Sequence, residues 1–149
     1  MKFDNSIKLY ERGLKSIAGG VSSQIRIDEP ADVPLFFAKA KGSKIWDADG
    51  NEYIDYMMGL LSVVLGYGDR EVDQAIRDQL ENGITLSLAT PLEAELAETL
   101  VELIPCAEMV RFGKNGSDVT TAAIRAARAL TGRDRVVICG YHGWQDWYI

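Results

Sequence analysis

The spacing of apolar residues predicts two amphipathic helices in the first half of the chain. Apolar side chains recur every three or four positions over residues 6–15, and Ser6 is available there as an N-cap. The same spacing returns over residues 69–82, where Asp69 precedes the first turn and can cap it. We therefore expect a helix in each of these two stretches, with one face of each buried.

A third helix is predicted by its start and stop signals. Residues 90–93 read Thr-Pro-Leu-Glu, which places a threonine at the N-cap, a proline at the first helical position and a glutamate where it can complete a capping box. Leucines follow on one stripe, and Pro105 ends the helix because proline cannot continue it.

Two stretches show strand patterns instead. Residues 34–57 hold β-rich runs broken by Lys-Gly-Ser and Asp-Gly-Asn, which predicts a small antiparallel meander. From residue 109 the pattern becomes strand, helix and strand: 109–112 are a short, mainly apolar run, 117–131 have helical spacing before Gly132, and 136–139 form a β-branched run. This order is typical of a right-handed βαβ unit in a parallel sheet, and so of an α/β fold.

Composition narrows the class of protein. The chain has 149 residues, 47% hydrophobic and 26% charged, which is typical of a soluble globular protein with one ordinary domain. Its net charge of −6 argues against nucleic acid or an anionic membrane as a partner. The longest apolar stretch, residues 57–66, is interrupted by glycines and is about half the ~20 residues of a spanning helix. The N-terminus has no signal-peptide pattern, so we expect a cytoplasmic protein.

The cysteines and the histidine do not suggest a metal site. Cys106 and Cys139 lie in or beside apolar runs and lack the spacing of metal ligands, so we expect two buried thiols. His142 is the single histidine of the sequence. A zinc cluster is therefore disfavoured, because only carboxylates and two distant thiols would remain as ligands.

The turn before the predicted helix at 117–131 is a candidate anion site. Residues 113–117 read Gly-Lys-Asn-Gly-Ser. A helix N-terminus carries partial positive charge, and Gly113 and Gly116 would let an anion approach the backbone closely. The stretch is neither a Walker loop, in which Lys directly precedes Ser or Thr, nor a GxGxxG motif. A tight turn in which Ser117 is merely the N-cap is the alternative interpretation.

A second candidate follows the next predicted strand, where Tyr141, His142 and Trp144 come directly after Gly140. Ligands of parallel sheets bind beyond the carboxyl ends of the strands, where both candidates lie. A phosphate cradle beside an aromatic platform would suit a planar, phosphorylated ligand. Alternatively, the aromatic residues pack against another domain or subunit.

Several long stretches resemble the first third of class-III aminotransferases. They are "GGVSSQIR" near the start, "LFFAKAKGSKIWDADGNEYIDYMMGLLSVVLGYGDREVDQAI" from residue 35, and "TPLEAELAETLVELIPCAEMVRFGKNGSDVTTAAIRAARALTGRDRVVICGYHGWQDW" from residue 90. The nearest branch is that of glutamate-1-semialdehyde 2,1-aminomutase. The resemblance implies a fold-type-I transferase that uses pyridoxal 5'-phosphate (PLP). It also implies a homodimer with the active site at the subunit interface.

The resemblance assigns roles to residues of both candidate sites. The Ser-Gly-Thr phosphate turn of the family matches Asn115, Gly116 and Ser117, and its Tyr-His-Gly matches residues 141–143. Asn115, Gly116 and Ser117 would then bind the cofactor phosphate. The ring of Tyr141 would lie against the cofactor's pyridine, with His142 beside it.

Two departures bear on the substrate. The early loop of the aminomutases reads Asn-Ser-Pro-Val-Arg, whereas residues 22–26 here read Ser-Ser-Gln-Ile-Arg. Arg26 can still clamp a substrate carboxylate, with Ser23 as a second contact, or it is a solvated or structural arginine. The tryptophan expected after the meander is replaced by Leu60 and Leu61, which favours transamination over the aminomutase reaction.

The resemblance also implies a lysine that holds PLP as a Schiff base, well downstream of the aromatic loop. None of the seven lysines matches that position; they are Lys2, Lys8, Lys15, Lys39, Lys41, Lys44 and Lys114. We therefore interpret the sequence as the N-terminal part of a larger enzyme that moves an amino group between an amino donor and a keto or aldehyde acceptor. A non-catalytic remnant that acts as a partner subunit is the alternative.

The same resemblance predicts the organisation of the chain. Residues 1–68 would form an N-terminal segment, with a helix, and the small-domain meander. Residues 69–90 would form a linking helix and an active-site loop. Residues 91–149 would begin the PLP-binding large domain, with its mainly parallel sheet and covering helices.

Overall fold

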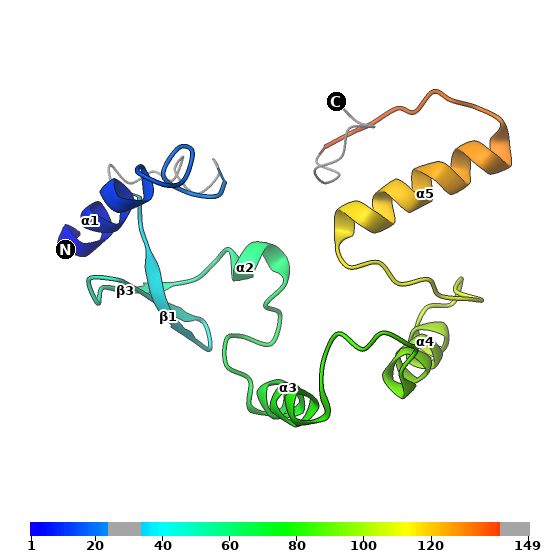
Figure 1. The fold of residues 1–149 in the computed structure, drawn as a ribbon, viewed down its shortest axis with the longest axis horizontal. Coiled ribbons are helices and arrows are strands. Elements are labelled where there is room, and N and C mark those ends of the chain that lie inside the picture. The colour runs from blue at the N-terminus through cyan, green and yellow to red at the C-terminus, as the bar shows by residue number, and fades with distance from the viewer. Residues whose placement is uncertain (24–33, 141–149) are drawn as a thin grey trace. The chain divides into compact units, whose positions relative to one another are not determined.

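The computed structural model describes residues 1–23 and 34–140. The chain divides into two compact units, a first unit of Met1–Thr85 and a second unit of Leu86–Ile149 (Figure 1). The three-part organisation expected from the sequence is finer than this division and stays a prediction.

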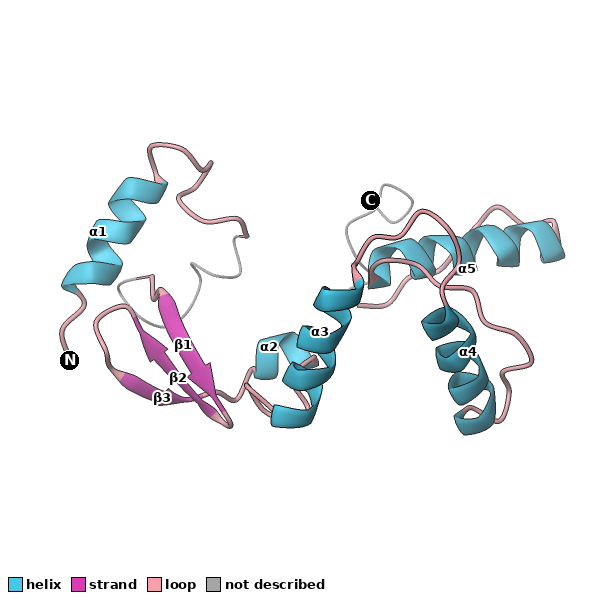
Figure 2. Ribbon diagram, turned by 60° about the horizontal axis from the view of Figure 1, so that its bottom comes forward, coloured by secondary structure: helices cyan, strands magenta, loops and turns pink. Residues whose placement is uncertain are grey.

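A three-stranded antiparallel sheet forms the centre of the first unit. Its strands are β1 (Phe37–Lys41), β2 (Lys44–Asp47) and β3 (Glu52–Ile54), paired in the order β1-β2-β3 (Figure 2). Gly42, in the turn between the first two strands, has a φ of 56°, a conformation that costs glycine little. The predicted meander is therefore confirmed.

Helix α1 (Asp4–Gly13) begins two residues before the predicted start and is capped from elsewhere in the chain. The Asp49 carboxylate accepts hydrogen bonds from the backbone N–H groups of Asn5, at 2.8 Å, and Ser6, at 3.0 Å. The prediction that Ser6 is the N-cap is wrong: Ser6 is fully buried inside the helix, and its hydroxyl oxygen accepts from the N–H of Phe36 at 3.5 Å. Asp49 thus ties α1 to the sheet.

Asp47, at the end of β2, is the other hub of this junction. Its side chain is only 2% exposed and accepts hydrogen bonds from the backbone N–H groups of Asp49 and Asn51, from the Asn51 side chain and from the Tyr53 hydroxyl. Burial alone would raise the pKa of Asp47, but the hydrogen bonds from Asn51 and Tyr53 outweigh it and lower the pKa below 3.8. Burial and the contact with Asp47 raise the pKa of Tyr53 to about 12.

Helix α2 (Met58–Leu61) is a left-handed turn. The φ angles of Met58, Gly59, Leu60 and Leu61 are 47°, 58°, 59° and 71°. Left-handed backbone costs about 1–2 kcal/mol for each residue with a side chain. Met58, Leu60 and Leu61 together therefore require contacts elsewhere in the structure that offset this cost.

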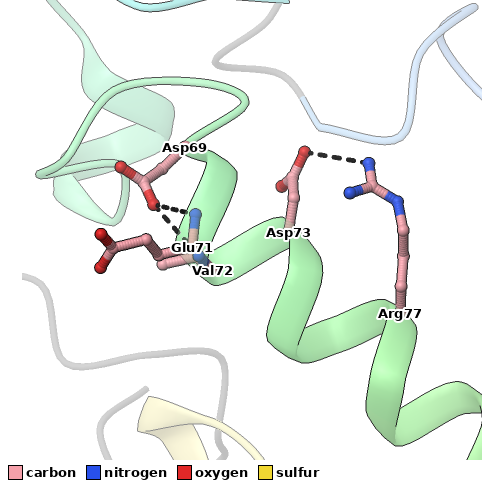
Figure 3. Close-up of polar contacts among 5 residues, drawn as sticks. All are labelled: Asp69, Glu71, Val72, Asp73 and Arg77. Carbon is pink, nitrogen blue, oxygen red and sulfur yellow. Dashed lines mark hydrogen bonds and ion pairs between the residues drawn. The ribbon is translucent and has the colours of Figure 1, made fainter.

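Helix α3 (Arg70–Asn82) follows the sequence prediction closely. Figure 3 shows the Asp69 carboxylate accepting from the backbone N–H groups of Glu71 and Val72, both at 3.0 Å. Asp73 and Arg77, four residues apart on the helix surface, form an ion pair of 3.5 Å. The predicted Asp69 cap is confirmed.

In the second unit, helix α4 (Pro91–Leu103) starts at the predicted residue but without the predicted capping box. Thr90 is the N-cap by position, yet its side chain makes no capping hydrogen bond. Its backbone carbonyl instead accepts from the N–H of Glu93 at 3.1 Å. The helix ends two residues before Pro105, as expected.

Helix α5 (Gly116–Thr131) confirms the helix predicted at 117–131. Gly132 adopts a left-handed φ of 65° and donates its N–H to the carbonyl of Arg128 at 2.9 Å, so the predicted C-terminal cap is also confirmed.

The strands predicted on either side of α5 are not formed. Residues 109–112 and 136–139 have no regular secondary structure, and residues 86–140 contain no strand. A β-strand exists only through hydrogen bonds to a neighbouring strand, and the described part of this unit provides none. The apolar pattern marks residues that are suited to a sheet, but it cannot supply the pairing partner.

The apolar side chains of the described residues are exposed or only partly buried. No apolar side chain in the described part of the chain is buried; Val137 in the second predicted strand is 99% exposed. Cys106 and Cys139 are free and exposed, so the expectation of buried thiols is wrong; within residues 86–140 the predicted sheet that would cover them is not formed. Within residues 1–23 and 34–140, no helix has the length and apolar character to cross a membrane.

Candidate functional site

The N-terminus of α5 brings together three of the predicted site residues. Asn115 is the N-cap, with extended backbone, and its side-chain oxygen accepts from the N–H of Asp118 at 3.0 Å. Gly116 and Ser117 are the first two residues of the helix. The alternative in which Ser117 is the N-cap is therefore wrong. Asn and Ser are equally good caps, so residue type alone could not decide between them.

Hydroxyl groups of the following turn brace this end of the helix. The carbonyl of Ser117 accepts from the hydroxyl of Thr121 at 2.8 Å and from that of Thr120 at 3.1 Å. Ser117 is half-buried, whereas Asn115 and Gly116 are exposed. The threonine hydroxyls thus fix the backbone of Ser117, at the helix end where a ligand would bind.

The two glycines of the turn have different surroundings. A Cβ atom added to Gly113 would lie 2.9 Å from a methyl carbon of Val119, so the Val119 side chain would have to shift. A Cβ atom added to Gly116 would meet nothing within 4 Å, and Gly116 has no positive φ. Packing within the unit does not explain glycine at 116. The open space above it would admit an anion to the helix N-terminus.

The charged side chains next to the turn leave the helix dipole as the main source of local positive charge. Lys114 lies in the loop before the helix, and Asp118 lies in its first turn. Their formal charges cancel, while the helix N-terminus contributes roughly half a positive charge. A helix N-terminus of this kind can bind an anionic group, so a phosphate site here stays a prediction.

A groove of about 790 Å³ also lies in the second unit, between the start of α4 and residues 110–112. Its lining is mostly apolar, with Thr90, Glu93 and Arg111 as the polar members. Residues 115–117 do not line it, so it is separate from the anion site. It takes no part in the phosphate assignment.

The other predicted site residues are not joined to this turn. Ser23 is exposed and lies in the first unit, without regular secondary structure. Arg26, Tyr141 and His142 lie outside the described residues. Of the predicted cofactor-binding residues, the structure therefore describes Asn115, Gly116 and Ser117.

Comparison with known proteins identifies the family of the chain. Residues 27–147 match the family model for aminotransferase class-III. The chain is 40% identical to 3-aminobutyryl-CoA aminotransferase of Cloacimonas acidaminovorans over 100% of its own length and 37% of the relative. It is 44% identical to glutamate-1-semialdehyde 2,1-aminomutase of Archaeoglobus fulgidus, covering 98% of the chain and 35% of that protein.

Solved structures agree as well. An omega-transaminase from Sphaerobacter thermophilus matches with a TM-score of 0.87 at 34% identity, over 95% of this chain and 32% of that one. A structure described as a transaminase with PLP bound matches with a TM-score of 0.90 at 30% identity, over 98% of this chain and 34% of that one. These likenesses confirm the predicted fold-type-I class. The chain spans about a third of the length of these relatives, and over that span it belongs to the class-III aminotransferase family.

Proposed function

We propose that the protein carrying this chain is a PLP-dependent aminotransferase that moves an amino group from an amino donor to a keto or aldehyde acceptor. The observation that carries the proposal is the family match over residues 27–147. The names of its relatives, an aminotransferase and an aminomutase among them, belong to the same chemistry of amino groups. When bound, PLP supplies the electron sink that such chemistry needs.

The residues at the start of α5 fit the phosphate group of PLP. Gly116 leaves open space over the helix N-terminus, and Asn115 fixes the first turn through Asp118. We assign Asn115, Gly116 and Ser117 to the phosphate, and Tyr141 and His142 to the ring of the cofactor. The phosphate contacts would hold the cofactor in place, and the aromatic ring would orient it.

Substrate binding is assigned on the early loop. Arg26 would bind a substrate carboxylate through two parallel hydrogen bonds, with Ser23 as a second polar contact. The lysine that carries the cofactor is placed outside these 149 residues, because none of the seven lysines matches the family's position. We further propose a homodimer with its active site at the subunit interface, and the three-part organisation of residues 1–68, 69–90 and 91–149.

An aminomutase is the second candidate, favoured by the 44% identity to the Archaeoglobus fulgidus enzyme. Leu60 and Leu61 stand where that branch is expected to have a tryptophan, which weighs against it. The two activities differ in the number of substrates. A transaminase needs a donor and an acceptor, whereas an aminomutase converts a single substrate.

The full-length protein, purified with its cofactor, provides the test. Cofactor absorbance is expected to stay with the protein through gel filtration. Amino transfer from a panel of amino donors should appear only when a keto acid or an aldehyde is added. Turnover of a single amino substrate without an acceptor would favour the aminomutase. A protein that retains no PLP and transfers no amino group would contradict both and leave the non-catalytic partner subunit.

A further inference from the structure

The left-handed turn of α2 is the most strained stretch of the described backbone. Met58, Leu60 and Leu61 all have positive φ, and none is a glycine. Glycine adopts this conformation freely, so Met and Leu are expensive choices for it. Strained residues of this kind persist only where their surroundings over-determine them.

One carboxylate supplies much of that support. The Asp55 side chain accepts from the backbone N–H of Met57 with one oxygen and from the Tyr67 hydroxyl with the other, both at 2.8 Å. The Tyr67 hydrogen bond, helped by bonds from backbone N–H groups of the turn, outweighs burial and lowers the pKa of Asp55, which is therefore ionised at neutral pH. Charge-assisted hydrogen bonds of this kind are stronger than neutral ones.

Both partners of this pair are anchored to the turn between β1 and β2. Gly42 and Tyr67 exchange backbone hydrogen bonds of 2.8 and 2.9 Å. The N–H of Asp55 donates to the carbonyl of Ser43 at 2.9 Å. Asp55 and Tyr67 therefore hold the two ends of the segment against the same piece of sheet.

Within the segment, by contrast, the support is polar and the side chains are exposed. Leu60 is 64% exposed and Leu61 is 72% exposed, so packing does little to hold them. The Ser62 hydroxyl donates to the carbonyl of Gly59 at 2.8 Å, and the N–H of Leu61 donates to the carbonyl of Met57 at 3.0 Å. The N–H of Val63 also donates to the carbonyl of Met58 at 2.9 Å, so without the contacts at the base the turn would depend on these hydrogen bonds alone.

We propose that Asp55 and Tyr67 form a latch and that residues 57–62 are a two-state element. With the latch closed, the turn is left-handed and presents Leu60 and Leu61 as a fixed apolar edge. With the latch open, the backbone relaxes out of the left-handed region and the two leucines move. This conformational device does not depend on the proposed enzyme activity.

Amide hydrogen exchange in the full-length protein tests the latch. The Tyr67→Phe variant should speed exchange of the Met57 and Leu61 amides on the order of tenfold, the scale of losing one hydrogen bond to a charged group. Tyr53→Phe is the matched control, because it removes the other tyrosine–aspartate hydrogen bond of the unit, also 2.8 Å long. Equal exchange of these amides in both variants would overturn the proposal.

Glycine substitutions test the strain independently and do not require the tyrosine variants to fold. Leu60→Gly is expected to keep or raise the midpoint temperature of unfolding, because glycine removes the cost of the left-handed backbone. Leu80→Gly, at a similarly exposed leucine in the right-handed helix α3, should lower it. Equal loss in both variants would mean that the turn is not strained, and would overturn the two-state element.

Discussion

At the scale of single residues, Gly113 and Gly116 lie three positions apart and differ in the space around them. At Gly113 a side chain would be crowded, since an added Cβ would approach a methyl carbon of Val119 to 2.9 Å. Gly116 has room, since nothing lies within 4 Å of an added Cβ. The two glycines can therefore be tested separately, Gly113 for its packing and Gly116 for the proposed phosphate.

This contrast gives a paired prediction. Gly116→Val should fold normally, because valine is a better helix former than glycine, but its side chain should occupy the space of the cofactor phosphate and sharply reduce PLP retention. Gly113→Ala should lower the midpoint temperature of the cofactor-free protein through its contact with Val119. Cofactor absorbance after gel filtration and thermal unfolding measure the two effects. Unchanged PLP retention by Gly116→Val would refute the phosphate assignment.

Asp47 predicts how acid affects stability. Its pKa is lowered in the folded protein from the ordinary 3.8, so its contribution to stability is complete above that value and is lost as the pH falls through the lower folded value. Thermal unfolding between about pH 6 and pH 2 should show this loss. Tyr53→Phe, which removes one donor to Asp47, should make the acid dependence shallower. An identical pH profile for the two proteins would show that the hydroxyl does not support the carboxylate.

At the scale of elements, sequence patterns predicted what depends on nearby residues. The Asp69 cap, the proline at the start of α4 and the glycine after α5 are signals within a few positions of the helix ends, and the structure has all three. Asp49 lies more than forty residues from Asn5 and Ser6, whose N–H groups it caps in α1, so no local pattern indicates it. The strands beside α5 were predicted from residue type, but their existence depends on a pairing partner.

The same distinction applies to the candidate site. The turn at 113–117 was recognisable because glycine and small polar residues precede a helical pattern, and the resemblance to a family gave it a ligand. The choice of Asn115 over Ser117 as the cap was not predictable, because both side chains suit that position. The structure shows that Asn115 is the cap and that Ser117 lies within the first turn.

The prediction for the elements concerns the N-terminal caps of helices α1 and α4. Asp49→Ala should lower the free energy of unfolding by about 1 kcal/mol, because it leaves the N–H groups of Asn5 and Ser6 without their acceptor. Thr90→Ala should have a much smaller effect, since the Thr90 side chain makes no capping hydrogen bond to α4. Chemical denaturation of both variants provides the comparison. Equal losses of unfolding free energy in the two variants would contradict the capping of α1 by Asp49.

At the scale of the whole molecule, exposed apolar surface is the dominant feature. The described residues contain no buried apolar side chain, and Met109 and Leu130 are 92% and 87% exposed. Burial of apolar area is the main favourable term in folding, at about 25 cal/mol for each Å². Large exposed apolar patches favour association. Among the described residues of the first unit, the buried side chains are the polar ones of Ser6 and Asp47, which hold polar junctions and do not form a hydrophobic core.

The last prediction concerns these 149 residues produced alone. We expect them to be aggregated or strictly oligomeric, because side chains such as Val137, 99% exposed, would otherwise remain in water. We also expect no transaminase activity and no PLP bound to a lysine, because none of the seven lysines matches the family's cofactor lysine. Light scattering measures the first property, and borohydride reduction followed by mass spectrometry measures the second. A monodisperse monomer would show that the exposed apolar surface is compatible with an independent fold. A PLP adduct on one of the seven lysines would instead support a cofactor site complete within these residues.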